Sequence, residues 1–158
     1  MESDLLRIYL RDHHAAAAGG VALAKRALGA RDPIAAQIAR DRETLEEIMG
    51  QLGISANPVK VGLVRIAERV SRLKLNGRLV RHSPLSHVVE LETLVVGVRG
   101  KEALWTALRT SDVRLERIDL DALVDSARAQ GSDLEARRVS AVSKAFARAT
   151  SAASHQIA

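Results

Sequence analysis

The sequence predicts an all-α protein, a four-helix bundle with an extra helix in the crossover between the second and third long helices. Apolar residues recur at the three- and four-residue spacing of amphipathic helices along most of the chain, and no segment shows the strict alternation of a strand. Glycine, proline and asparagine separate these segments where helices would end and begin. The 158 residues suffice for one domain, which we place at 1–150 and follow with a C-terminal tail, 151–158, predicted to fray.

The first two helices have clear end signals. We predict the first helix over residues 3–28 and expect Gly29 to end it. Asp32 is the expected cap of a second helix over 33–52, because Pro33 follows it and proline is favoured in the first helical turn.

The connection and the third long helix follow Asn57. A connecting helix is expected over 58–75. The third long helix is expected from Pro84 to about Arg109, with a kink or interruption near Gly97 and Gly100.

The fourth long helix is predicted over about 119–150, with Asp119 as its cap.

The third long helix carries apolar residues on nearly every side, so we expect it at the centre of the bundle. Glu92 lies four residues after Val88 and three before Val95, and therefore shares their face. A carboxylate buried among such side chains must be paired with a cation or take part in chemistry.

Composition excludes several kinds of site. The chain has no cysteine, which excludes disulfides, thiolate metal sites and cysteine nucleophiles. It has one Trp, one Tyr and one Phe, which argues against a stacking platform for single-stranded nucleic acid. The N-terminus lacks a signal-like apolar core and no apolar run has the length of a membrane span, so we expect a cytoplasmic protein without membrane contact.

Four long helices joined by one long crossover resemble the ferritin-like superfamily. Residues 38–53, an acidic and leucine-rich run that ends in Leu-Gly, are similar to the second helix of such proteins. The resemblance implies a bundle fold, and it also favours a homodimer.

The metal chemistry of that superfamily is not expected here. Its di-iron centres use a Glu from each of two helices and Glu-x-x-His from the other two. None of the five histidines follows a glutamate by three residues. Ala39 and Arg42 stand at this spacing on the second helix, and Glu135 is followed by Arg138 on the fourth, so we predict no cofactor.

Acids and arginines could instead meet inside the bundle. The inward face of the first helix passes either Asp12 or His13, that of the second passes either Asp41 or Arg42, and that of the fourth passes Arg138. We predict that Glu92 pairs with Arg138 or Arg42 in a buried network that fixes the helix positions. The full predicted network comprises Asp12, Arg42, Glu92 and Arg138. If the protein is instead a divergent iron or manganese carboxylate protein, its ligands would be Asp12, Glu43, Glu92 and Glu135.

The positive charge is concentrated in residues 58–82, which hold seven Lys and Arg against one acid. One interpretation is a solvated or salt-bridged face. The other is contact with an acidic protein, a polyanion or the phosphates of nucleic acid, without sequence readout. The candidate anion-binding residues are Arg65, Arg69, Arg72, Arg78 and Arg81.

No catalytic motif is present. Gly97 to Lys101 lacks the spacing of a phosphate-binding loop, and no nucleophile elbow occurs. We therefore predict a non-enzymatic protein that acts through protein–protein contacts as a homodimer. The two alternatives are the metal-carboxylate protein and polyanion binding through the basic segment.

Overall fold

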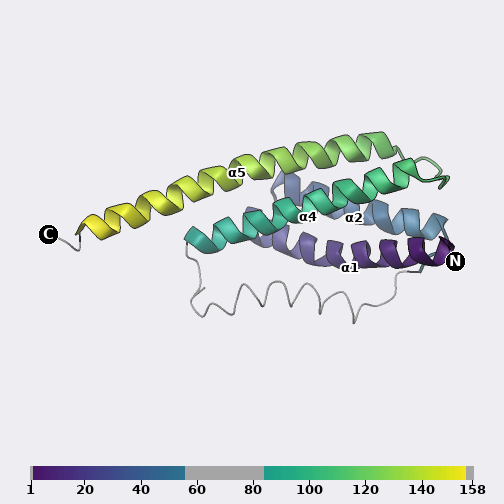
Figure 1. Ribbon diagram of the computed structural model, residues 1–158, viewed down its shortest axis with the longest axis horizontal. Helices are drawn as coiled ribbons and strands as arrows, with labels where there is room; N and C mark the ends of the chain where they lie inside the picture. Colours follow the sequence, from purple (N-terminus) through teal and green to yellow (C-terminus); the bar gives the residue numbers. More distant parts are fainter. Residues whose placement is uncertain (1, 56–83, 156–158) are drawn as a thin grey trace.

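The computed structural model describes residues 2–55 and 84–155, which form a bundle of α-helices (Figure 1). These residues contain no strand, and the predicted all-α bundle is confirmed. The helices are α1 (Glu2–Leu28), α2 (Pro33–Gln51), α4 (Pro84–Thr110) and α5 (Leu120–His155). The helix predicted over 58–75 lies outside the described residues. None of the described helices has the length and apolarity needed to span a membrane.

The order of the helices in space follows from their contacts. α1 and α2 are antiparallel, because Leu10 packs near Ile48 at one end and Ala24 near Ile34 at the other. α4 and α5 lie side by side and antiparallel (Figure 1). α2 and α4 run in the same direction, because Ile48 and Leu108 near their C-terminal ends lie in one apolar cluster and Ile34 and Leu91 nearer their N-terminal ends lie in the other (Figure 1).

The predicted helix ends are largely confirmed. The Asp32 side chain accepts a hydrogen bond from the Ile34 amide at 2.9 Å, as an N-cap does. Asp119 likewise accepts one from the Ala122 amide at 2.9 Å. Gly29 follows α1 with a φ of 99°. This left-handed backbone conformation is unfavourable for residues that have a Cβ.

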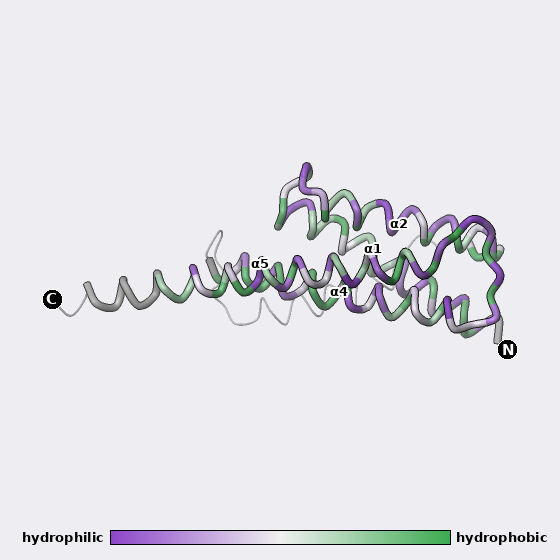
Figure 2. Tube along the Cα trace, turned by 90° about the horizontal axis from the view of Figure 1, so that it is seen from above, coloured by the Kyte–Doolittle hydropathy of each residue, from purple (hydrophilic) through white to green (hydrophobic). Residues whose placement is uncertain are grey.

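Two predicted boundaries differ from the structure. α4 continues through Gly97 and Gly100 as a single helix. Glycine, unlike proline, keeps the backbone N–H that donates the helical hydrogen bond. α5 continues to His155, past the predicted end near 150, and its C-terminal part extends beyond the N-terminal end of α4 (Figures 1 and 2).

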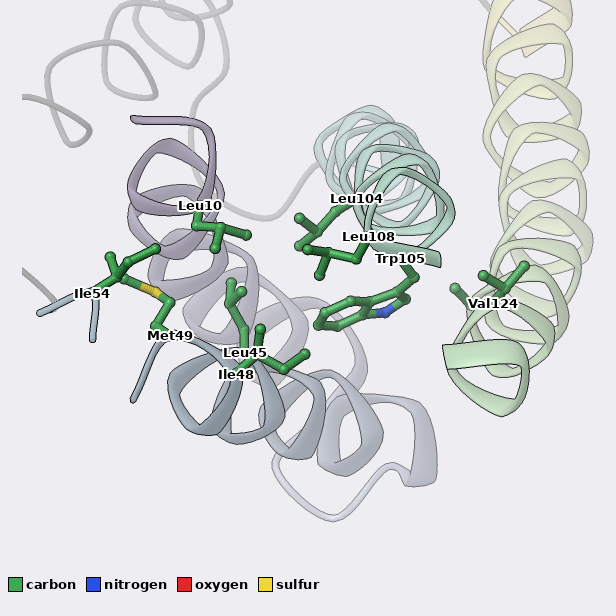
Figure 3. Packing of buried hydrophobic residues seen from close by; sticks show 10 residues of the cluster. Leu10, Leu45, Ile48, Met49, Ile54, Leu104, Trp105, Leu108 and Val124 are labelled. Carbon is green, nitrogen blue, oxygen red and sulfur yellow. The ribbon is translucent and has the colours of Figure 1, made fainter. Parts of the chain in front are cut away.

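The core consists of two apolar clusters, one toward each end of the bundle. In the first, Trp105 reaches from α4 toward Leu45 and Ile48 on α2, with Val124 of α5 beside it (Figure 3). The second cluster contains Leu91 with other residues of all four helices. The apolar clusters leave a layer of polar side chains between them.

Candidate functional site

The polar layer between the two clusters is built around Lys101 of α4. Its ammonium group donates hydrogen bonds to the carboxylate of Asp41 on α2 and to the side-chain oxygen of Gln130 on α5. The Gln130 amide nitrogen in turn donates to Asp41 Oδ2 at 3.1 Å and to Ser126 Oγ at 3.2 Å. Side chains from three helices therefore satisfy one another inside the bundle.

Burial governs the electrostatics of this group. The side chains of Lys101 and Asp41 are only 15% and 11% exposed. Burial lowers the pKa of Lys101, and the nearby Asp41 carboxylate partly opposes that shift. With its ammonium held by two acceptors, Lys101 is suited to fixing α2, α4 and α5 relative to one another.

A second polar group links α1 to α2. The Nε2 atom of the buried His14 lies 2.8 Å from Glu46 Oε1, and Arg42 approaches the same oxygen at 3.0 Å. The hydrogen bond with His14 lowers the pKa of Glu46; burial opposes this shift, and Arg42 adds to it. All four helices thus contribute a polar side chain to the middle of the bundle.

The predicted buried network is wrong about which side chains lie inside. Arg138 does approach Glu92 at 3.6 Å, but the Glu92 side chain is 50% exposed. Asp12 is exposed, and Arg42 pairs with Glu46 one turn away on its own helix. Of the two alternatives left open on α2, the structure places Asp41 inside.

The rotation of α4 explains the error. Its inward face follows Val88, Leu91, Leu94 and Val98. Glu92 instead shares its stripe with Val96, which is 68% exposed. Because α4 is apolar on nearly every side, the sequence pattern could not decide which side faces inward. Lys101 was missed, although its position three residues after Val98 and four before Trp105 satisfies the rule that we applied to Glu92.

The alternative metal ligands do not come together. Asp12 and Glu43 are exposed, and Glu135 receives two hydrogen bonds from Arg138, at 2.6 and 2.7 Å. Within residues 2–55 and 84–155, no three His, Cys, Asp or Glu side chains cluster closely enough to hold a metal ion.

The outer face of α4 and α5 carries a second candidate site. Large apolar side chains are exposed on both helices: Leu85 at 50% and Val96 at 68% on α4, and Val139 at 51% on α5. Seven residues separate Leu85 from Glu92 and four separate Glu92 from Val96, so these three share one stripe. The outer α4–α5 face is defined here as Leu85, Glu92 and Val96 of α4 with Glu135, Arg138 and Val139 of α5.

Ion pairs occupy the seam between the two helices. Arg138 lies 3.6 Å from Glu92 and 2.6 Å from Glu135, which joins the two stripes. Further along the seam, Glu102 binds Arg99 and Arg128, each at 2.9 Å. Asp125 also approaches Arg128, at 3.4 Å, so the seam contains charges of both signs, and the exposed apolar side chains lie beside it.

The five arginines proposed for anion binding, Arg65 to Arg81, lie outside the described residues, so that interpretation stays a prediction. No known protein family, no curated protein and no solved structure matches this chain. Its function is therefore inferred from its own residues and their geometry.

Proposed function

We propose that the protein is a non-enzymatic helical-bundle protein, ferritin-like in organisation, that acts through protein–protein contacts and self-associates through the outer α4–α5 face. The observation that carries this proposal is the group of exposed aliphatic side chains beside a seam of ion pairs. The parallel direction of α2 and α4 supports the ferritin-like organisation, because one long crossover produces that arrangement.

The exposed aliphatic side chains supply a driving force for association. Fully burying a Val or Leu side chain contributes about 1.5–3 kcal/mol. Leu85, Val96 and Val139 are each at least half exposed, so roughly half of that remains to be gained at each. A two-fold dimer would bury two copies of each side chain, one from each protomer.

The charges of the face suit a second copy of the same chain. Glu92, Glu135 and Arg138 lie together on the face, so it presents both signs. In a two-fold contact, an acid of one protomer can lie against the arginine of the other.

Light scattering coupled to size-exclusion chromatography tests the proposal. We expect the wild-type protein to have twice the 17.1 kDa mass of one chain. Val96→Glu and Val139→Glu should each yield monomers, because each places an unpaired carboxylate in the apolar part of the contact. Circular dichroism should show that both variants keep their helices.

Leu5→Glu is the matched control. Leu5 of α1 is 67% exposed, almost the same as Val96, but it lies on another helix. The control should remain a dimer. A monomeric wild type would overturn the proposal, and so would an effect of Leu5→Glu equal to that of Val96→Glu.

A further inference from the structure

A groove of about 530 Å³ opens at the end of the bundle where α1 ends, α4 begins and α5 passes both. Its main lining side chains are Leu28, His87, Leu91, Arg137, Ala141 and Lys144. The groove shares no residue with the outer α4–α5 face, so what it binds is independent of the proposed dimer.

The groove combines an apolar wall with basic side chains. Leu91 belongs to the second apolar cluster, and Leu28 and Ala141 pack against that cluster, so one wall of the groove is continuous with the core. Arg137 and Lys144 are the charged residues of the lining, and it includes no acid. A ligand that matches both parts needs an apolar chain and an anionic head.

Arg137 is held in place but keeps donors to spare. Its Nη1 atom donates to Asp32 at 2.7 Å and its Nη2 atom to Asp133 at 3.2 Å. Each of these nitrogens carries two hydrogens, so one hydrogen on each remains for a further acceptor. The Lys144 side chain is exposed and lines the groove, so its charge can reach a bound ligand.

We infer that this groove binds an aliphatic carboxylate, with the chain along Leu28 and Ala141 and the carboxylate at Lys144 and Arg137. The head group is singly charged in this assignment, because Asp32 and Asp133 already offset part of the positive charge of Arg137. The same chemistry would recognise a free fatty acid or the carboxylate end of a larger lipid.

The test is a titration of the full-length protein with octanoate, followed by the amide shifts in nuclear magnetic resonance spectra. We expect saturable shifts at residues near His87, Leu91 and Lys144. The uncharged 1-octanol should bind at least tenfold more weakly, because it cannot pair with the two cations. If octanol binds as tightly as octanoate, the carboxylate is not recognised and the assignment is wrong.

Two variants separate the groove from general charge effects. Lys144→Glu should weaken octanoate binding at least tenfold. Lys25→Glu makes the same charge change on an exposed residue near the end of α1 that does not line the groove, and it should leave the affinity within twofold. Equal losses in both variants would indicate nonspecific attraction, and the absence of saturable shifts in the wild-type protein would overturn the inference outright.

Asp32→Asn provides a change in the opposite direction. Asparagine remains a good helix cap, so α2 keeps its start, while the charge that pairs with Arg137 is removed. We expect octanoate to bind severalfold more tightly to this variant. Weaker binding in Asp32→Asn, with helix content unchanged, would contradict a role for Arg137 in holding the carboxylate.

Discussion

Lys101 shows how one residue can hold several helices together. Its ammonium lies between Asp41 of α2 and Gln130 of α5, and removal of either partner would leave a buried polar group without its match. A buried ion pair contributes little net stability compared with apolar residues of similar size, but losing only one member is costly. Lys101, Asp41 and Gln130 therefore fix the relative positions of the helices more than they raise the free energy of unfolding.

Lys101→Met should lower the free energy of unfolding by about 3 kcal/mol, because the Asp41 carboxylate stays buried after its cation is lost. Adding Asp41→Leu to that variant should restore part of the loss, since no charge then remains inside and only the Gln130 oxygen stays buried without its partner. Urea denaturation of the single and double variants measures both effects. A double variant less stable than Lys101→Met would contradict this account.

The Arg109–Asp121 pair is the matched surface control. Arg109 Nη1 lies 2.9 Å from Asp121 Oδ1, but the Asp121 side chain is 79% exposed. Arg109→Met should therefore change the free energy of unfolding by less than about 1 kcal/mol.

At the level of helices, the end of α1 depends on the backbone conformation of a single residue, Gly29. Gly29 has a φ of 99°, whereas Gly50 lies within α2 and is exposed to solvent. A Cβ added at either glycine would meet nothing within 4 Å, so steric crowding does not distinguish them. Only the backbone conformation does.

Gly29→Ala should destabilise the protein by about 1 kcal/mol, because alanine resists the left-handed conformation. Gly50→Ala should stabilise it by about 0.5–1 kcal/mol, because alanine favours the helix interior. Thermal denaturation of the two variants gives the comparison. Shifts of the same sign would contradict the assignment of Gly29 as the end of α1.

At the level of the whole molecule, the proposed dimer couples stability to protein concentration. The native state is stabilised by association, so the melting temperature should rise with concentration in the wild-type protein. Val96→Glu should abolish this dependence and Leu5→Glu should keep it. Calorimetry over a hundredfold range of concentration is the measurement, and a wild-type melting temperature independent of concentration would argue against the dimer.

Much of the fold could be predicted because its signals are local. Asp32 and Asp119 cap the helices that follow them, and Gly29 ends the helix before it, through interactions within a few residues. The candidate sites were harder to predict. The predicted contact between Glu92 and Arg138 exists, but at the surface, and Lys101 was not identified.

The sequence by itself determined the number and order of the described helices and most of their ends, because hydrogen bonding and capping depend on neighbouring residues. Only the tertiary structure decided how each helix is rotated. α4 has aliphatic residues on most sides, and contact with α1 and α5 selected Leu91 for the core and left Val96 at the surface. That rotation turned Glu92 outward and Lys101 inward, since the gain from burying apolar side chains is summed over the whole packed face and is not set by any one residue.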